Sequence, residues 1–345
     1  MVMQRVKLDE YISWQIPQLQ QQLIAADEIV VSSSGSTGLQ KQVIIKKTAF
    51  DTSTKLANKY LNAKPGQTWS LLLPVTHIAG VNVLLRASEL GTEVIDNRQR
   101  ENYIDADFVS VVPTQIYKAL TEDKNLLRHL KNAKAVLVGA AAIKIEIFNQ
   151  AIENGINLIR TYGMSETCGG CIYEGSPLPG VKLEIKSGII YLNSPTMASG
   201  YLNQPKLWDE NFKAGWFKTN DLGQIVKSKL EVIGRSDDVV ITGGEKVSIS
   251  EIDSFLTQTF PTITFKTFAI DDAKWGQIIG LAMDKMDKEV QLSQIIQALL
   301  NKFPKYYLPK RFFRVAAMPK TELNKISQGV LLELLSKNEL TEISQ

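Results

Sequence analysis

The sequence predicts an α/β protein with a large N-terminal domain of mixed α/β sheet layers, a β-hairpin-rich subdomain and a small α+β C-terminal domain. Three observations predict this architecture. Strand-like apolar runs alternate with helix-like segments through the first half of the chain. Hairpin-like strand pairs begin after Gly180, and a compact series of helix-like and strand-like segments fills residues 236–345. We therefore expect two domains, 1–235 and 236–345.

The first half carries buried strands that end in loops of small residues. The expected strands are 28–31, 68–74, 92–96, 107–112 and the beginnings of 134–143 and 156–163. Helical apolar spacing follows at 79–90, and Pro113 begins a second helix over 113–120, because proline is tolerated in a first helical turn. Ligands of α/β sheets bind at the carboxyl ends of the strands, so we expect the ligand site at these loops.

The second half changes to hairpins and then to a compact module. Two β-hairpins are expected, at 181–192 with a turn at 186–188 and at 223–234 with a turn at 227–229. The helices and strands expected in the module are 250–258, 265–270, 278–283, 292–303, 312–318 and 329–337. This mixed order favours an α+β domain.

Composition and charge exclude several classes of protein. The 345 residues are 44% hydrophobic and 22% charged with a net charge of +3, far from the dense basic face of a nucleic-acid binder. Charges interrupt the N-terminal segment, so no signal peptide is visible. Pro74, His77 and Asn82 interrupt the most apolar stretch, 71–85. We expect a cytoplasmic protein without nucleic-acid partners or stable membrane insertion.

The stretch "VSSSGSTGLQK" (31–41) follows an apolar strand and combines serines, glycines, a threonine and a lysine. Backbone N–H groups, small hydroxyls and one cation are what a phosphate group needs. Two residues separate Gly38 from Lys41, so this is not a Walker loop, and no GxGxxG sequence indicates a dinucleotide fold. From these residues alone, a phosphate-binding loop and a flexible linker are both open interpretations.

Four further motifs follow the serine loop. They are "TYGMSET" (161–167), "GWFKTNDLG" (215–223), "GRSDDVVITGGEKVS" (234–248) and "PKTELNKIS" (319–327). In this order, the five motifs resemble the adenylate-forming superfamily of acyl-CoA synthetases, luciferases and peptide-synthetase adenylation domains. The resemblance runs from about Glu28 to the C-terminus. Most members carry a longer section before the serine loop, so we expect a shortened N-terminal section.

The resemblance implies an ATP site. The serine-loop residues that would hold the β- and γ-phosphates are Ser33, Ser34, Gly35, Ser36, Thr37 and Gly38, with Lys41 either a further phosphate contact or a solvated lysine. Tyr162 would lie against adenine, Ser165 would meet the α-phosphate and Glu166 would bind Mg²⁺. Asp221 and Arg235 would contact the ribose. Without the resemblance, "SET" would be an N-cap serine with a first-turn glutamate, and Asp221 and Arg235 would be turn residues.

The resemblance also assigns two steps to the C-terminal domain. Lys325 would bridge the α-phosphate and the acyl carboxylate during adenylation, where its charge offsets the charge on phosphorus. Gly243 and Gly244 would line the tunnel for the pantetheine arm of CoA. This implies a mobile domain with Asp237 as its hinge. A surface lysine and a linker turn are the alternatives for Lys325 and Asp237.

The segment 71–95 is similar to that of the o-succinylbenzoate–CoA ligases of menaquinone biosynthesis, which carry an arginine nine positions after a histidine. His77 would match the aromatic residue that gates the active site, and Arg86 would pair with the spectator carboxylate of the substrate. The other acyl-site candidates are Thr114, Gly139, Gly163 and Thr167. The alternatives are a packed core histidine and an internal Arg–Asp pair.

Cys168 and Cys171 form a C-x-x-C sequence directly after the Mg²⁺ glutamate. A zinc site needs a second pair of ligands, and the chain has no other cysteine and only His77 and His129. We expect both cysteines to line the acyl pocket, and a redox pair is the alternative.

Together the resemblances imply an AMP-forming acid–CoA ligase that uses ATP, Mg²⁺ and CoA, most similar to o-succinylbenzoate–CoA ligase. The acid would attack ATP to give an acyl-adenylate and pyrophosphate, and CoA would then displace AMP. The alternatives are another aryl or short acyl-CoA ligase and a non-catalytic adenylate-binding protein. Small molecules are the expected partners, and a homodimer is compatible with the sequence.

Overall fold

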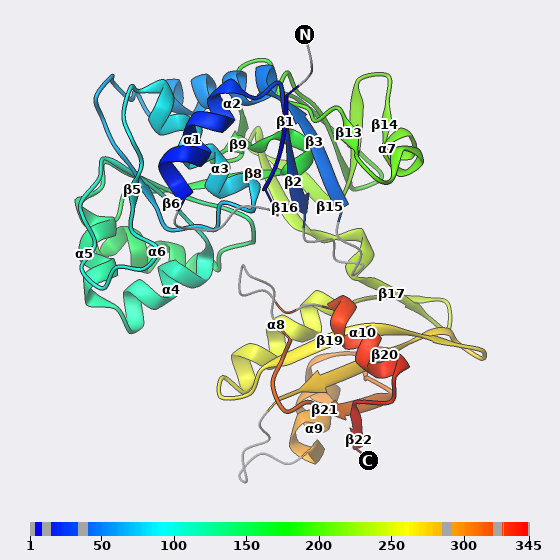
Figure 1. The fold of residues 1–345 in the computed structure, drawn as a ribbon. Coiled ribbons are helices and arrows are strands. Elements are labelled where there is room, and N and C mark those ends of the chain that lie inside the picture. Colours follow the sequence, from blue (N-terminus) through cyan, green and yellow to red (C-terminus); the bar gives the residue numbers. More distant parts are fainter. Residues whose placement is uncertain are drawn as a thin grey trace. The chain divides into compact units, whose positions relative to one another are not determined.

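The computed structural model describes residues 4–8, 15–33, 41–284, 292–319, 326 and 328–343. The described chain forms two compact units (Figure 1). Of the described residues, the first unit comprises 4–8, 15–33, 41–219 and 223–232, and the second comprises 220–222 and those from 233 onward. Both mix helices with sheets, so the predicted α/β class is confirmed. Within the described residues, no helix has the length and apolar character needed to cross a membrane.

A seven-stranded sheet organises the first unit. Its strand order is β10 (Ser176–Pro177), β9 (Gly169–Tyr173), β8 (Leu158–Met164), β7 (Ala135–Val138), β6 (Phe108–Val111), β4 (Trp69–Leu71) and β5 (Ile95–Asp96). The strands from β8 to β5 pair in parallel, whereas β9 and β10 are antiparallel. The carboxyl ends of β4, β6, β7 and β8 therefore meet at one edge of the sheet.

Helices cover both faces of this sheet. The helices of the first unit are α1 (Ile16–Ala25), α2 (Lys47–Tyr60), α3 (Ile78–Glu89), α4 (Pro113–Thr121), α5 (Lys124–Asn132), α6 (Ile145–Glu153) and α7 (Pro205–Asn211). Phe108 and Leu137 pack in one core cluster with α1, α2 and α3. Their neighbours Val109 and Val136 pack in another with α4, α5 and α6. Because β6 and β7 are buried on both faces, they read as continuous apolar runs in the sequence.

A second sheet of the first unit has the order β1 (Arg5–Lys7), β2 (Glu28–Ser33), β3 (Lys41–Lys46) and β13 (Gly200–Tyr201). The hairpin-rich part contains β11 (Lys182–Lys186), β12 (Ile189–Asn193), β14 (Phe212–Lys213), β15 (Trp216–Val226) and β16 (Lys229–Arg235). Its predicted turns are confirmed. Ser187 and Gly188 have φ of 50° and 80°, and Lys227 and Ser228 have φ of 48° and 62°, as type I′ hairpin turns require.

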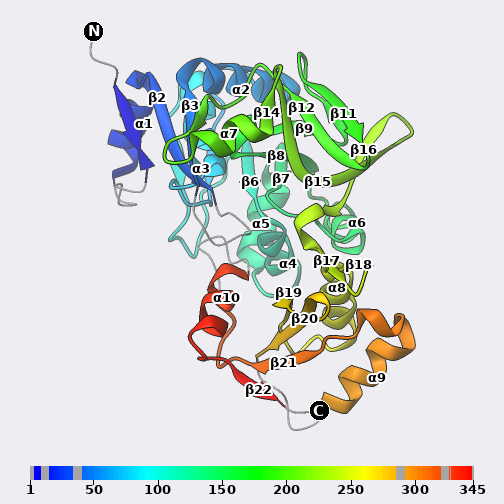
Figure 2. The ribbon, with the colours of Figure 1, turned by 90° about the vertical axis from the view of Figure 1, so that its right-hand side faces the viewer.

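The second unit is a sheet covered on both faces. Its strands are β17 (Val239–Thr242), β18 (Glu245–Ser248), β19 (Phe265–Asp272), β20 (Gly276–Met283), β21 (Arg311–Arg314) and β22 (Thr341–Ile343), and its helices are α8 (Ile249–Thr259), α9 (Leu292–Lys302) and α10 (Gln328–Ser336). Figure 2 shows α9 and α10 on either side of these strands. The core agrees, because Phe312 packs with α8 and α9, and its neighbour Phe313 packs with Leu331 of α10.

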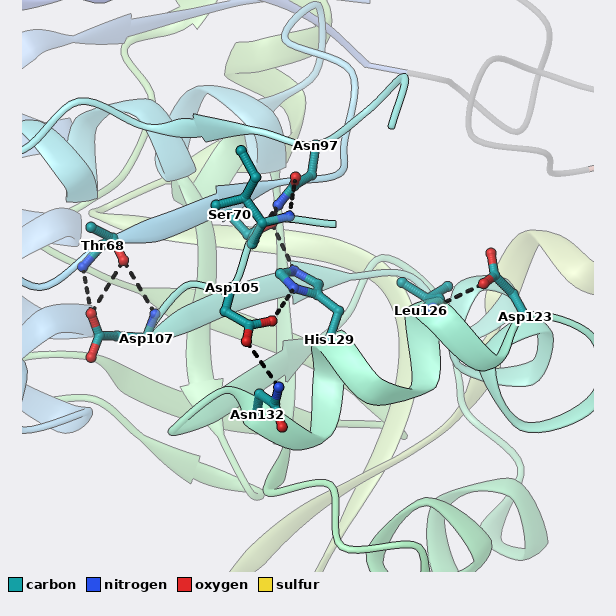
Figure 3. Close-up of polar contacts among 10 residues, drawn as sticks. Thr68, Ser70, Asn97, Asp105, Asp107, Asp123, Leu126, His129 and Asn132 are labelled. Atoms are coloured by element: carbon teal, nitrogen blue, oxygen red, sulfur yellow. Dashed lines mark hydrogen bonds and ion pairs between the residues drawn. The ribbon is translucent and has the colours of Figure 1, made fainter. Parts of the chain in front are cut away.

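A buried polar cluster joins α5 to the sheet of the first unit (Figure 3). His129 has no exposed surface, and its Nε2 lies 3.0 Å from Ser70 Oγ. Asn97 Nδ2 donates to the same hydroxyl at 2.9 Å, and Asp105 Oδ1 lies 3.7 Å from His129 Nδ1. Burial lowers the pKa of His129, and the nearby Asp105 offsets this only in part. The imidazole is therefore a neutral structural group, and the folded state disfavours its protonation.

We expect the free energy of unfolding to fall as the pH drops below about 6.5, the pKa of an unfolded histidine. Between that pH and the lower folded pKa, only the unfolded chain gains the proton, so this group contributes a loss of up to about 1.4 kcal/mol per pH unit. His129→Gln should remove this part of the pH dependence. Urea unfolding of both proteins at pH 5.5 and 7.5 measures the difference. If the free energy of unfolding changes equally with pH in both proteins, the His129 proton does not govern stability.

Candidate active site

A cavity of about 90 Å³ lies at the carboxyl ends of the parallel strands. Residues of α3 and β9 complete its wall, and the residues that line it from the strand ends are Leu73, Ser110, Val111, Val112, Leu137, Gly139, Ala140, Thr161, Gly163 and Met164. This is the edge at which the sequence predicts the ligand site, because loops at the carboxyl ends of parallel strands leave room for ligands.

Two glycines let the backbone form part of this wall. A Cβ atom on Gly139 would lie 2.5 Å from Thr161 Oγ1. One on Gly163 would lie 2.0 Å from the carbonyl oxygen of Gly169. A side chain at Gly163 would therefore clash with backbone, and one at Gly139 would require the Thr161 hydroxyl to move. Both predicted acyl-site glycines thus line the cavity.

Arg86 of α3 is the cation of the cavity wall and is only 4% exposed. Its Nη2 lies 3.4 Å from the Tyr173 hydroxyl, and its guanidinium carbon lies 5.2 Å from the centroid of the Trp69 ring. Its Nε has no hydrogen-bond partner, and no aspartate or glutamate in the described chain forms an ion pair with it. An unpaired buried charge is costly. The internal Arg–Asp pair is therefore not found, and the site suits an anionic ligand.

Two more unpartnered polar atoms belong to residues of the same wall. Asn82 Oδ1 and Ser110 Oγ are buried without a hydrogen-bond partner. Asn82 is fixed by its other side-chain atom, because its Nδ2 donates to the carbonyl oxygen of Cys168 at 2.9 Å. Neither residue was predicted as part of the site, although each is a polar residue inside an apolar run, "VNVLL" or "FVSVV". Buried polar groups without partners indicate a polar ligand.

The turn η3 (Ser165–Thr167) holds the predicted α-phosphate and Mg²⁺ residues. Ser165 and Glu166 are each 8% exposed. The Tyr201 hydroxyl donates to Glu166 Oε1 at 2.6 Å. Burial, and then the Glu166 carboxylate, raise the pKa of Tyr201, so its hydroxyl stays protonated. No lysine or arginine of the described residues forms an ion pair with Glu166, so this carboxylate retains an unneutralised oxygen that fits Mg²⁺.

Two predicted acyl-site residues, Thr114 and Thr167, do not line the cavity. Thr114 is exposed on the first turn of α4, while Ser110 and Val112 line the wall instead. Thr167 is fully buried, and its hydroxyl donates to the carbonyl oxygen of Gly169 at 2.8 Å within the turn. The structure therefore assigns Thr167 a local structural bond and leaves Thr114 outside the wall.

The predicted pocket-lining role of the cysteines is wrong. Cys168 and Cys171 lie in the hydrophobic core, and the cavity is lined instead by Gly169 and Gly170 between them. Burial raises the pKa of both thiols, that of Cys171 to about 12, so neither forms a reactive thiolate. Cys168 ends the η3 turn in a left-handed conformation, with φ of 55°.

The other candidates between residues 33 and 162 belong to the serine loop or are His77 and Tyr162. Ser33 and Lys41 are paired across β2 and β3, so the ends of the serine loop lie side by side. Ser34, Gly35, Ser36, Thr37 and Gly38 lie outside the described residues. His77 directly precedes α3, whose Ile78 and Ala79 line the cavity. Tyr162 of β8 is half-buried against the core.

The second unit contains the other candidates that the structure describes. Arg235 Nη1 lies 3.4 Å from Asp221 Oδ1, so the two predicted ribose contacts are brought together. Gly243 and Gly244 form the turn between β17 and β18 with positive φ of 59° and 87°. Asp237 lies in η4 (Ser236–Asp238), and Lys325 lies outside the described residues.

An aromatic residue that the sequence analysis missed lies beside this glycine turn. A Cβ on Gly243 would meet the Trp275 ring at 2.8 Å. The indole is 40% exposed, and Lys310 Nζ lies 3.2 Å from its ring centroid. The ammonium group of Lys310 therefore lies over the face of the indole and forms a cation–π contact with it.

Known proteins resemble the chain in sequence. The family model of the AMP-binding enzymes matches residues 25–202. A probable 2-succinylbenzoate–CoA ligase of Mycobacterium tuberculosis is 34% identical over 273 residues, which cover 74% of this chain and 70% of that protein. The 2-succinylbenzoate–CoA ligase of Escherichia coli is 27% identical over 318 residues, covering 89% of this chain and 69% of that protein.

Solved structures share the fold. The o-succinylbenzoate CoA synthetase (MenE) of Bacillus subtilis in complex with the acyl-adenylate OSB-AMP has a TM-score of 0.75 at 22% identity, covering 88% of this chain and 68% of that chain. ATP-bound MatB of Rhodopseudomonas palustris has a TM-score of 0.76 at 20% identity, covering 90% and 68%. The family model spans more than half of the residues, and the chain belongs to the AMP-binding enzymes of the adenylate-forming superfamily.

Proposed function

We propose that this protein is a 2-succinylbenzoate–CoA ligase of menaquinone biosynthesis. It would convert 2-succinylbenzoate, ATP and CoA to the CoA thioester, AMP and pyrophosphate through an acyl-adenylate. The observation that carries the acyl substrate is Arg86, a buried cation on the cavity wall with no ion-pair partner among the described residues. The names of the relatives from Mycobacterium tuberculosis and Escherichia coli support the same substrate.

The substrate has two carboxylates, and the first unit offers a different environment to each. Arg86 would bind the spectator carboxylate, while the other would meet the α-phosphate near Ser165. Glu166 would hold Mg²⁺, which supplies charge neutralisation to the phosphates. A MenE structure of Bacillus subtilis with ATP and magnesium ion supports this pair of ligands. Lys325 would stabilise the charge that develops on phosphorus.

Further residues would contact the ribose and CoA. Asp221 and Arg235 would bind the ribose, and the turn at Gly243 and Gly244 would admit the pantetheine arm of CoA. The Trp275 ring and Lys310 beside this turn suit an aromatic base and a phosphate of the same cosubstrate. We propose 1–235 as the ATP- and acyl-binding domain and 236–345 as the mobile domain.

Pyrophosphate release tests the proposal most directly. We expect release from ATP and 2-succinylbenzoate without CoA, and thioester formation when CoA is added. Benzoylpropionate, which lacks the ring carboxylate, should react at least tenfold less efficiently if the Arg86 contact contributes about 1.4 kcal/mol or more. Preference for a simple aryl or short acid would favour another acyl-CoA ligase. ATP binding without any pyrophosphate release would favour a non-catalytic adenylate-binding protein.

Asp237→Pro tests the proposed hinge. Proline fixes φ near −65° and so removes the rotation that a hinge needs. We expect acyl-adenylate formation to stay within about tenfold of the wild type while CoA transfer is lost, provided that the fixed angle suits adenylation. Single-turnover measurements of each step separate the two effects. Asp237→Ala is the control, because it leaves φ free. Wild-type rates for both steps in the proline variant would show that Asp237 is not the hinge.

Location and assembly belong to the same proposal. Use of ATP and CoA favours a cytoplasmic location, since both are cytoplasmic metabolites. A homodimer is compatible with this function, and light scattering of the purified chain distinguishes a dimer from a monomer.

A further inference from the structure

We propose that Tyr201 is a positioning residue for the metal-binding carboxylate of Glu166. The inference rests on the proposed function, in which Glu166 holds Mg²⁺. Tyr201 and Glu166 are far apart in the sequence, yet the tyrosine hydroxyl donates to Glu166 Oε1 at 2.6 Å. None of the motifs in the sequence analysis includes Tyr201.

The backbone around Glu166 is held independently of this hydroxyl. The amide N–H of Ala198 donates to the carbonyl oxygen of Glu166 at 2.8 Å, and Thr196 Oγ1 donates to that of Thr167 at 2.9 Å. Both donors belong to the segment that leads into β13. Loss of the tyrosine hydroxyl alone should therefore leave the turn in place and free only the carboxylate.

The tyrosine ring is itself rigidly placed. Tyr201 is 3% exposed, and the Trp208 ring packs edge-on against it with centroids 5.3 Å apart. β13 pairs with β3 through Tyr201 and Val43. A fixed hydroxyl occupies Oε1 and selects one carboxylate orientation, so Oε2 is left for a cation. Partners of this kind orient metal ligands and typically contribute a factor of about 10–100 in metal affinity.

The same ring also contacts the end of the serine loop. Lys41 Nζ lies 5.2 Å from the centroid of the Tyr201 ring. A cation over an aromatic face is attracted by the negative face of the ring. Tyr201 therefore links two parts of the proposed phosphate site, the Mg²⁺ carboxylate through its hydroxyl and Lys41 through its ring. Removal of the hydroxyl separates these contacts, because phenylalanine keeps the ring.

Tyr201→Phe tests the proposal through metal binding rather than turnover. Mn²⁺ would be titrated into the protein with a non-hydrolysable ATP analogue and followed by electron paramagnetic resonance. We expect the Kd for Mn²⁺ to rise about 10- to 100-fold, while affinity for the metal-free analogue and the Tm change little. Tyr103→Phe is the matched control, because its hydroxyl also donates to a carboxylate, Asp123 Oδ2 at 3.3 Å, but away from the site.

The outcomes separate this inference from the proposed function. In a Glu166→Gln background, Tyr201→Phe should have no further effect on Mn²⁺ binding, since the oriented ligand is already gone. A Kd within twofold of the wild type in the single Tyr201→Phe variant would overturn the positioning role. The role would also be overturned if Tyr201→Phe weakened binding of the metal-free nucleotide as much as binding of Mn²⁺ and also lowered the Tm. That result would indicate a structural bond. A wild-type protein that binds neither Mn²⁺ nor the analogue would overturn the proposed function itself.

Discussion

Lys325→Ala is expected to slow acyl-adenylate formation about a thousandfold, a loss of about 4 kcal/mol of transition-state stabilisation. The physical reason is the loss of the cation that offsets negative charge on the α-phosphorus as the acid attacks. Thioester formation from supplied acyl-adenylate should survive, because CoA then attacks the acyl carbon and the α-phosphorus is not attacked. ATP–pyrophosphate exchange measures the first step, and thioester release from synthetic acyl-adenylate measures the second.

Lys337→Ala is the control for this experiment. Its ammonium group forms an exposed ion pair with Glu333 one helical turn away, at 2.7 Å. Such surface pairs contribute little, so both steps should keep wild-type rates. Near-normal exchange in Lys325→Ala would exclude that lysine from adenylation and leave it a surface residue.

Arg86→Met should raise the KM for 2-succinylbenzoate about a hundredfold while leaving the KM for ATP within about twofold. Methionine keeps much of the side-chain volume but cannot pair with the spectator carboxylate. The KM for benzoylpropionate should change little in the same variant, because that acid has no second carboxylate to lose its partner. Initial rates of pyrophosphate release with both acids measure this selectivity.

Stability distinguishes this role from a structural one. The described structure pairs Arg86 with no carboxylate, so removal of its buried charge should leave the Tm unchanged or raise it. A fall in Tm with equal effects on both acids would indicate that the arginine supports the fold. Arg160→Met is a control for the kinetics, because that arginine also stacks on a ring, with its guanidinium carbon 4.5 Å from the Phe148 centroid, but outside the cavity wall. It does not serve as a control for the Tm, since Arg160 also forms an ion pair with Glu174 at 2.7 Å.

Local signals were enough to predict many elements. The strand ends at β6, β7 and β8 were predictable because their apolar runs stop at small residues, and parallel strands bring such ends together. The turns at 187–188 and 227–228 were also predictable from short polar segments between alternating strands. α2 was not among the predicted elements. Its buried face carries the polar residues Ser53, Thr54 and Asn58, so its sequence lacks the regular spacing of apolar residues that indicates a helix.

Some residues of the candidate site were likewise predictable from the sequence, and others were not. The sequence by itself determined the order of the motifs and the family. It also predicted Arg86, Gly139 and Gly163 as acyl-site candidates, and all three line the cavity. The side chains that complete the site depended on contacts between distant segments. Tyr201 meets Glu166 only because β13 pairs with β3 beside the 165–167 turn.

Side-chain direction was likewise decided by the tertiary structure. Cys168 and Cys171 enter the core, whereas the glycines between them line the cavity. Asn82 and Ser110 acquire unpartnered atoms only where their helix and strand enclose the same space. Sequence patterns report periodicity along one segment, whereas burial and unsatisfied polar groups arise when several segments pack together.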